Sequence, residues 1–333
     1  MSAQRVAVLA GGRSSEYEVS LASGASVAEG LRTAGHTVTE INIGRDGVWR
    51  REGEPVMVAL GSGLPGIDVV FPVLHGPFGE DGTVQGLLEC LDMPYVGAGV
   101  LASALCMHKV VFKQLMADQG IPQVAYRAVD ELDHAADPKA TADAVAELGY
   151  PVFVKPARLG SSVGIAKVAD PGELPAALQT AFAHDSVAIV EAFAAGREVE
   201  CSVLGNGDPI ASEPGEILLA AGEVGWYDYE AKYAEGGMRL EVPARVGPEV
   251  RDRIRTLAVQ AFTASGCQGL ARVDFFVVGP DVLVNELNTM PGFTPTSVFG
   301  SLFAASGIEY PDLLDRLVAL ALERHAAEAK LSH

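Results

Sequence analysis

The sequence predicts a multidomain α/β protein that opens on a parallel sheet. Its 333 residues exceed one average domain and fit two or three. An apolar run at residues 5–10, a helical pattern to about residue 34 and a second apolar run at 36–43 form a strand–helix–strand unit, which implies parallel strands. Much later, residues 272–288 hold two β-branched and aromatic runs, which is typical of an antiparallel hairpin. We therefore expect a parallel sheet first and antiparallel strands near the C-terminus.

Composition and charge limit the classes of function. Hydrophobic residues make up 49% of the chain, as in a well-packed globular protein. A formal net charge of -19 disfavours nucleic-acid binding, because phosphate backbones require basic patches. No apolar run approaches the roughly 20 residues that cross a bilayer, and the first residues do not resemble a signal peptide. We expect a soluble, cytoplasmic protein without a nucleic-acid or membrane partner.

The first predicted strand is followed by the loop Gly11-Gly12-Arg13-Ser14-Ser15-Glu16. Ligands usually bind at this end of parallel strands, where helix N-termini can meet an anion. The loop lacks the Gly-x-Gly-x-x-Gly pattern of dinucleotide folds, so a nicotinamide site is not expected. Glu16 would favour a cation such as an ammonium group, or would complement the helix dipole from the first turn. The residues leave both roles open.

A glycine-rich stretch, residues 75–86, follows a buried strand predicted at residues 68–74. It holds four glycines and two acids in twelve residues, which indicates an unusual backbone path. His75 ends the strand and faces the expected crevice, although an isolated histidine is more often structural. We interpret residues 94–99 as the exit from the first domain.

A candidate phosphate-binding loop comes after a helix predicted at residues 100–119, which carries Lys109. Lys155 ends the next strand, and the following turn contains Ser161 and Ser162. A Gly/Ser-rich turn beside a lysine suits phosphate binding through backbone N–H groups, although an ordinary flexible loop would have the same composition. The Walker pattern is absent, so a P-loop is not expected.

Two acids and a long loop follow. Glu191 ends a strand at residues 187–191 and Glu198 lies seven residues later; both could accept hydrogen bonds from adenosine or could be surface acids. Residues 222–241 show no clear period and contain Lys232 and Tyr233. Loops of this length are usually functional or disordered, and the aromatic content favours a lid.

The hairpin carries the strongest chemical signal. If its loop is residues 279–281, Asp274 lies across from Glu286 and Arg272 across from Asn288, all on one face. Carboxylates that face each other at about 5 Å repel, so a cation is expected between them. Oxygen-only ligands suit Mg²⁺ shared with substrate phosphates. The alternative is a surface hairpin with solvated acids.

Taken in order, these motifs resemble those of ATP-grasp ligases, and specifically of the D-alanine:D-alanine ligase family. The most diagnostic are His75-Gly-x-x-Gly-Glu-Asp-Gly-x-Val-Gln-Gly86 and Arg272-x-Asp274 with Glu286-x-Asn288-x-x-Pro-Gly292. Three more occur in the family's order: Gly11-Gly12-x-Ser-x-Glu16, Lys155-Pro-x-Arg-x-Gly-Ser161-Ser-x-Gly164 and Glu230-Ala-Lys232-Tyr233. The likeness covers nearly the whole chain.

The resemblance implies an ATP-grasp fold of three domains. They would be an N-terminal α/β domain at 1–98, a central lid domain at 99–191 and a C-terminal domain at 192–333, which holds the hairpin and the lid loop 222–241. ATP would be gripped between the last two. The resemblance also implies a homodimer and leaves a requirement for K⁺ open.

The resemblance further implies roles for individual residues. Two Mg²⁺ or Mn²⁺ ions would be bound by Asp274, Glu286 and Asn288. ATP would be bound by lysines at the phosphates, acids at the adenosine and the phosphate loop: Lys109, Lys155, Ser161, Ser162, Glu191, Glu198 and Lys232. D-Alanine would be bound by Glu16, His75, Lys232, Arg272, Gly292 and Ser297.

Within these sets, the resemblance places Glu16 on the ammonium of the first D-alanine and His75 close to its carboxylate. Lys232 and Ser297 would hold the carboxylate of the second D-alanine. The catalytic set would be Glu16, Ser161, Tyr233, Arg272 and Gly292. Ser161 and Tyr233 would join the phosphate loop to the lid, while Arg272 and the Gly292 N–H would stabilise the oxyanion.

The activity implied is ATP-dependent ligation of two D-alanines through a D-alanyl phosphate, giving D-alanyl-D-alanine for peptidoglycan precursors. One alternative is a ligase that makes D-alanyl-D-lactate or another D-alanyl ester. Lys232 and Tyr233, which mark the dipeptide makers in the resemblance, oppose it. A second alternative is a non-catalytic ATP-binding module, which would be expected to have lost Arg272 or the metal-binding acids.

Overall fold

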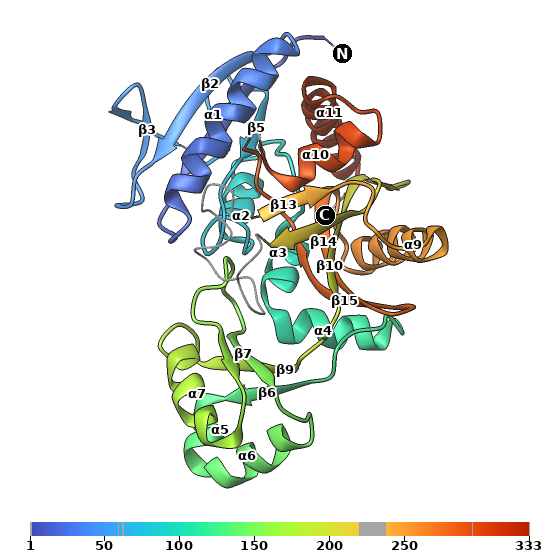
Figure 1. Ribbon diagram of the computed structural model, residues 1–333. Helices are drawn as coiled ribbons and strands as arrows, with labels where there is room; N and C mark the ends of the chain where they lie inside the picture. Colours follow the sequence, from blue (N-terminus) through green and yellow to red (C-terminus); the bar gives the residue numbers. More distant parts are fainter. Residues whose placement is uncertain (1, 59, 62, 220–237, 295, 333) are drawn as a thin grey trace.

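The computed structural model describes residues 2–58, 60–61, 63–219, 238–294 and 296–332, whose strands form three sheets (Figure 1). The sheets follow one another along the chain, and helices cover them. This mixed α/β architecture confirms the predicted fold class. The domain boundaries at residues 98 and 191 stay a prediction.

The first sheet has the predicted parallel core. Its strand order is β4-β3-β2-β1-β5, with β1 paired in parallel to both β2 and β5 and the other pairs antiparallel. The strands are β1 (Arg5–Gly11), β2 (Thr37–Ile43), β3 (Trp49–Arg51), β4 (Glu54–Pro55) and β5 (Val69–Pro72). Side chains on both faces of β1 are buried, as expected of a central parallel strand.

Helices from both ends of the chain cover this sheet. The covering helices are α1 (Tyr17–Thr33), α2 (Thr83–Cys90), α10 (Val298–Ala305) and α11 (Tyr310–Glu328). One apolar core joins β1 and β5 to α1, α10 and α11, and another joins the opposite face to α2. Arg324 of α11 is buried and donates hydrogen bonds to the carbonyls of Tyr95 and Gly97. Helix α11 is thereby fixed to the exit from the first sheet.

The second sheet is four-stranded and antiparallel, in the order β6-β9-β7-β8. Its strands are β6 (Tyr126–Asp130), β7 (Val152–Pro156), β8 (Ala166–Val168) and β9 (Val187–Ala192). Beside them lie α5 (Glu131–Ala136), α6 (Pro138–Ala146), a 3₁₀ turn at Pro171–Glu173 and α7 (Leu174–Phe182). Side chains of α6 and α7 share one core with this sheet. The face that carries Ile189 packs instead against Val110.

The single helix predicted at residues 100–119 is wrong, because the chain forms two helices. They are α3 (Val100–Met107) and α4 (Lys109–Asp118), bent by 102° at His108. The Lys109 N–H leaves the helical pattern to bond the Ala157 carbonyl at 2.9 Å, and the His108 side chain caps α4. Among the described residues, no single helix is long and apolar enough to cross a membrane, and α3 with α4 meets that criterion only jointly, across this bend.

The third sheet has six antiparallel strands, ordered β13-β12-β10-β14-β15 with β11 beside β10. Its strands are β10 (Arg197–Gly205), β11 (Ile210–Ala211), β12 (Gly215–Leu219), β13 (Met238–Glu241), β14 (Gly269–Val278) and β15 (Asp281–Asn288), and α9 (Pro248–Ala264) packs on it. Helix α4 lies between this sheet and the second one (Figure 1). The described end of the predicted lid loop, residues 238–241, is strand β13.

The hairpin confirms the predicted pairing but not the predicted turn. Val278 pairs with Asp281, so the turn contains two residues and not three. An extra residue in β15, Asn285, then bulges between Val284 and Glu286. The bulge restores the predicted pairs and reverses the alternation, so that Glu286 leaves the buried face occupied by Val284. Without the bulge, this carboxylate would point into the apolar core.

Candidate functional site

An acid-rich group of side chains gathers on the hairpin; we call it the hairpin cluster. It consists of Lys109, Glu200, Arg272, Asp274, Glu286 and Asn288. Arg272 donates to both oxygens of Asp274, each at 2.7 Å, and its Nε lies 2.8 Å from Glu200 Oε2. Asn288 Nδ2 also donates to Asp274, at 3.1 Å. On the neighbouring strand, opposite Asp274, the Glu286 Oε2 atom lies 3.0 Å from Lys109 Nζ.

The electrostatics of the hairpin cluster hold its arginine charged. Burial by itself would lower the pKa of Arg272, but the carboxylates of Asp274 and Glu200 outweigh it and raise the pKa well above its ordinary value. Glu200 was missed by the sequence analysis. It pairs with Asp274 across β10 and β14, so the signal lies in strand register and not in any short motif.

The hairpin cluster fits the predicted magnesium site by the chemistry of its donors. Asp274 and Glu286 supply carboxylate oxygens from adjacent strands, and Asn288 supplies an amide. In the described part of the chain, no group of three or more His, Cys, Asp or Glu side chains is arranged to hold a metal. Mg²⁺ on the hairpin would therefore complete its coordination with water and substrate phosphates, as it usually does.

A base-rich group of side chains lies between α4 and the second sheet; we call it the buried lysine cluster. It consists of Lys113, Lys155 and Glu191. Lys113 Nζ lies 2.9 Å from Glu191 Oε1, and Lys155 Nζ lies 2.5 Å from Glu191 Oε2. Only 3% of the Glu191 side chain is exposed, which rules out the surface-acid interpretation of this residue.

The charges of the buried lysine cluster support one another. Burial would raise the pKa of Glu191, but the two ammonium groups outweigh it and lower the pKa to about 2. Burial would lower the pKa of Lys155, but the carboxylates of Glu191 and Glu286 outweigh it and raise the pKa. Burial dominates at Lys113 and lowers its pKa. Lys113 was missed by the sequence analysis, although it lies one helical turn after Lys109.

The predicted phosphate loop adopts a strained path and reaches the first sheet. Ser161 and Ser162 have φ of 52° and 58°, which is uncommon for residues with a side chain. Arg158 and Asp185 anchor the loop through a bidentate ion pair, in which the guanidinium donates to both carboxylate oxygens. At its tip, the Ser161 hydroxyl donates to Glu16 Oε1. The loop therefore meets the acid that the resemblance places on the ammonium of the first substrate.

Two acids lie at that meeting point, the buried Glu16 and the half-buried Glu80. Glu16 occupies the N-cap position of α1 without making a side-chain cap, so its carboxylate is directed to Ser161. Glu80 accepts a hydrogen bond from the Gly76 N–H at 2.9 Å. Burial, followed by the charge of Glu16, raises the pKa of Glu80 to about 8, so Glu80 is largely protonated at neutral pH. Its motif was recognised in the sequence, but no role was assigned to it.

His75 connects two motifs that are distant in the sequence. Its Nδ1 lies 3.0 Å from the Met290 carbonyl and its Nε2 lies 3.3 Å from Ser23 Oγ, which in turn accepts from the Phe293 N–H. Burial lowers the pKa of His75, which favours the neutral ring that this arrangement needs. Both ring nitrogens thus fix the backbone on either side of Gly292, and a contact with substrate stays a prediction.

Gly292 and Ser297 lie against each other. A Cβ at Gly292 would come within 2.9 Å of Ser297 Oγ, closer than side chains tolerate, and Ser297 Oγ lies 2.8 Å from Thr294 Oγ1. Any larger residue at position 292 would clash with Ser297, which explains the glycine there.

Three predicted site residues remain. Glu198 lies on β10 and contributes to the raised pKa of Lys155, and Lys232 and Tyr233 fall outside the described residues.

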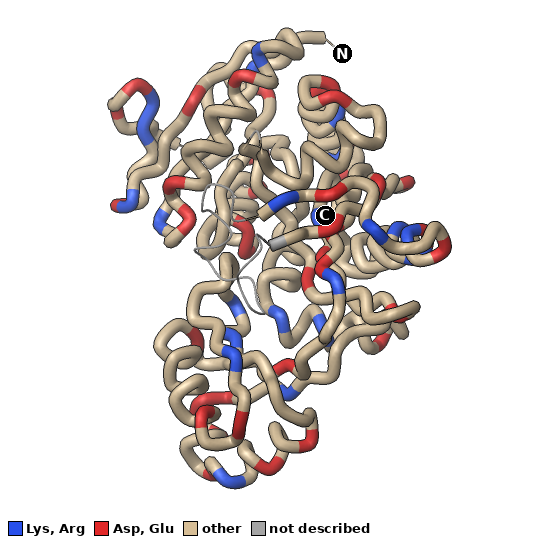
Figure 2. The backbone as a smooth tube through the Cα atoms, viewed as in Figure 1, with Lys and Arg blue, Asp and Glu red and all other residues tan. Residues whose placement is uncertain are grey.

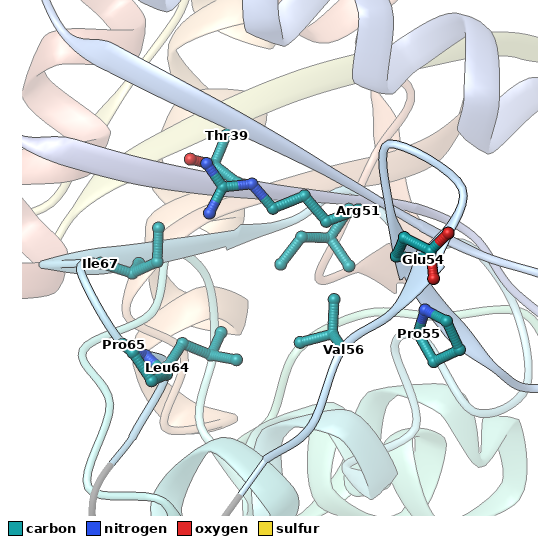
Figure 3. Close-up of a pocket in the computed structure, with 9 residues that line it drawn as sticks. Thr39, Arg51, Glu54, Pro55, Val56, Leu64, Pro65 and Ile67 are labelled. Carbon is teal, nitrogen blue, oxygen red and sulfur yellow. The ribbon is translucent and has the colours of Figure 1, made fainter.

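Two cavities lie in the N-terminal part of the structure. The larger, about 280 Å³, lies beside β2 to β4, where Arg51 extends toward Thr39 above Val56, Leu64 and Ile67 (Figure 3). None of the predicted site residues lines it. The smaller, about 170 Å³, is bounded by the Gly11–Ser14 loop and by His75. Acidic positions occur in all parts of the fold (Figure 2), so the negative charge is not confined to either cavity.

Comparison with known families gives matches along most of the chain. A profile described as D-ala D-ala ligase N-terminus matches residues 5–63 and 55–98, and one described as D-ala D-ala ligase C-terminus matches residues 115–319. The D-alanine--D-alanine ligase of Deinococcus radiodurans is 48% identical over 96% of this chain and 99% of its own length. That of Halothermothrix orenii is 45% identical, with 97% and 99% covered.

Solved structures are similar as well. The D-alanine-D-alanine ligase from Coxiella burnetii has a TM-score of 0.88 and 34% identity, covering 99% of this chain and 97% of its own. The VanG D-Ala:D-Ser ligase from Enterococcus faecalis has a TM-score of 0.86 and 37% identity, covering 96% of this chain and all of its own. Both structures share the ATP-grasp fold, so overall shape does not separate enzymes that differ in the second substrate.

Proposed function

This chain belongs to the D-alanine–D-alanine ligase family, and we propose that the hairpin cluster and the buried lysine cluster form the site where it uses ATP to join two D-alanines. One observation carries the proposal. Asp274 and Glu286 face each other on adjacent strands, and each is already paired with a cation. An acid pair held in this way suits Mg²⁺ and ATP phosphates, as the reaction of the family requires.

The first step would form D-alanyl phosphate. A carboxylate oxygen of the first D-alanine attacks the γ-phosphorus of ATP, the bond from that phosphorus to the β,γ-bridging oxygen breaks, and ADP leaves. Lys109 and Lys155 would bind the phosphates and neutralise the charge that spreads over them. Two Mg²⁺ ions, held by Asp274, Glu286 and Asn288, would polarise the same phosphates when bound. Glu16 would hold the ammonium of this D-alanine.

The second step would form the peptide bond. The neutral amine of the second D-alanine attacks the acyl carbon, and the carbonyl oxygen gains negative charge. Arg272 and the Gly292 N–H would donate to that oxygen, and loss of one such donor typically costs about 3 kcal/mol of barrier. Phosphate then leaves with the electrons of the broken C–O bond, and the amine loses its proton. His75 would contribute by fixing the backbone beside Gly292.

Several finer assignments belong to the same proposal. Lys232, Tyr233 and Ser297 would bind and enclose the second D-alanine, whose acyl phosphate partner must be kept from water. Glu191 and Glu198 would bind the adenosine. We also propose a homodimer in the cytoplasm that uses Mg²⁺ or Mn²⁺. A role for K⁺ is left to the experiment below.

Phosphate release, with products resolved by mass, tests the proposal. The purified protein would receive ATP and Mg²⁺ with D-alanine, L-alanine, D-serine or D-lactate, singly and in pairs, with and without K⁺. D-Alanine alone should give D-alanyl-D-alanine and one phosphate per dipeptide. A preference for mixed products with D-serine or D-lactate would reassign the second substrate, and absence of D-alanine-dependent phosphate release would contradict the proposal.

A further inference from the structure

We propose that Lys113 is a positioning residue of the nucleotide site, which holds Glu191 in place as a carboxylate when Lys155 turns to the phosphates of ATP. This inference rests on the proposed function, because it needs Lys155 at the phosphates and Glu191 at the nucleotide. It adds a residue that the family motifs in this sequence do not contain.

The buried lysine cluster divides one carboxylate between two lysines. Each oxygen of Glu191 meets one ammonium, Oε1 that of Lys113 and Oε2 that of Lys155. The lysines come from different elements, Lys113 from α4 and Lys155 from the end of β7. Glu191 itself lies in β9, directly between Tyr126 of β6 and Phe153 of β7. Its position is thus set by the sheet, and its charge is balanced from two sides.

The two lysines differ in their access to a ligand. The Lys113 side chain is 1% exposed, whereas the Lys155 side chain is 11% exposed. Lys155 lies at the end of β7, directly before the predicted phosphate loop. The Lys113 ammonium also lies 5.7 Å from the centre of the Tyr126 ring, and its backbone carbonyl accepts a hydrogen bond from Gln123. Lys113 is therefore enclosed by protein, and Lys155 is the member of the pair that can reach a phosphate.

An exchange of partners follows when ATP binds. The phosphates compete with Glu191 for Lys155, and the carboxylate that Lys155 releases stays buried. A buried carboxylate without a counter-ion is costly and tends to take up a proton, which would abolish it as a charged acceptor. Lys113 remains at 2.9 Å and supplies that counter-ion. Before ATP binds, Lys113 also weakens the attraction between Glu191 and Lys155, because it already pairs with one of the two carboxylate oxygens.

Helix α4 is placed to serve both clusters. Lys109 and Lys113 are four residues apart and lie on the same side of the helix. Lys109 reaches Glu286 on the third sheet and Lys113 reaches Glu191 on the second. Figure 1 shows α4 between these sheets.

Lys113→Met tests the inference through binding and not through turnover. Thermal unfolding would be followed with and without ATP and Mg²⁺, in the absence of D-alanine, and the Kd for ATP measured by calorimetry. Without nucleotide, Glu191 keeps Lys155 and the variant should unfold close to the wild-type temperature. With ATP, the Kd should rise roughly 10- to 100-fold and the thermal shift should shrink accordingly. Lys113→Arg should restore part of the affinity.

A matched control and a double variant complete the test. Lys139→Met removes an exposed lysine, 82% accessible and paired with Asp143, and should leave the Kd unchanged. In a Glu191→Gln background, Lys113→Met should change the Kd little further, because Lys113 acts through that carboxylate.

The outcomes distinguish a failure of this inference from a failure of the proposed function. A lower unfolding temperature of Lys113→Met with an unchanged Kd would show a purely structural lysine and overturn the inference. Additive effects of Lys113→Met and Glu191→Gln on the Kd would also overturn it. If the wild type fails to bind ATP with Mg²⁺, the proposed function itself is contradicted.

Discussion

The hairpin cluster and the buried lysine cluster are opposite in charge and in access to water. The first sets three carboxylates, Glu200, Asp274 and Glu286, against two cations, and these five charged side chains are 12–22% exposed. The second sets two lysines against one carboxylate, and its side chains are 1–11% exposed. The acid-rich cluster suits a metal cation and the base-rich cluster suits phosphate. In each, the protein supplies the counter-ion that a ligand would replace.

The difference in burial predicts whether a substitution in each cluster mainly lowers activity or stability. Removing one partner of a charge pair that water can reach costs the fold little stability. Substitutions in the hairpin cluster should therefore lower the activity more than the free energy of unfolding. Charges enclosed by protein are left uncompensated when their shared partner is removed, so the buried lysine cluster should lose stability when Glu191 is replaced. The next two substitutions separate these effects.

The largest effect is expected from Glu286→Gln in the hairpin cluster. Removing one of the two facing carboxylates weakens the proposed metal site, so ATP-dependent phosphate release should fall by roughly 100-fold or more. The free energy of unfolding should change by about 1 kcal/mol or less. Glu29→Gln on the exposed side of α1 is the control. Near-normal phosphate release by Glu286→Gln would remove this residue from the metal site.

The largest effect on stability, by contrast, is expected from Glu191→Gln in the buried lysine cluster. The change leaves Lys113 and Lys155 facing each other without their shared carboxylate. Denaturant unfolding without nucleotide should show a loss of about 3–5 kcal/mol. A stability equal to that of Glu286→Gln would mean that burial does not distinguish the clusters, and the comparison would fail.

The smallest effect concerns Glu80, whose pKa is raised first by burial and then by the charge of Glu16. Because its pKa is raised to about 8, the folded protein holds a proton that the unfolded chain releases near its ordinary pKa of 4.5. The stability from this proton is complete below that ordinary pKa and is lost as pH rises through about 8. Unfolding temperatures of the wild type should therefore decline between pH 6 and pH 9, and Glu80→Gln should decline less. Parallel profiles would show that Glu80 does not titrate there.

Local patterns in the sequence predicted much of this site. Alternating strands joined by a turn predicted that Asp274 faces Glu286, and the structure confirms the pair. The predicted turn was one residue too long, and the bulge at Asn285 compensated for it. Turn chemistry and alternation are short-range properties, so a hairpin can be read with few errors. The bulge depends on burial of Val284 on the opposite face, which a pattern of residues does not show.

The sequence by itself determined the family, the parallel opening sheet and the loops that meet at the site, because each rests on neighbours in the chain. Only the tertiary structure decided that α3 and α4 separate at His108, that Glu200 joins Arg272, and that Lys113 is enclosed beside Glu191. A lysine in a helix is usually solvated, and its burial depends on a carboxylate 78 residues away reaching it through a different sheet. Long-range packing sets that contact, and with it the charge of the nucleotide site.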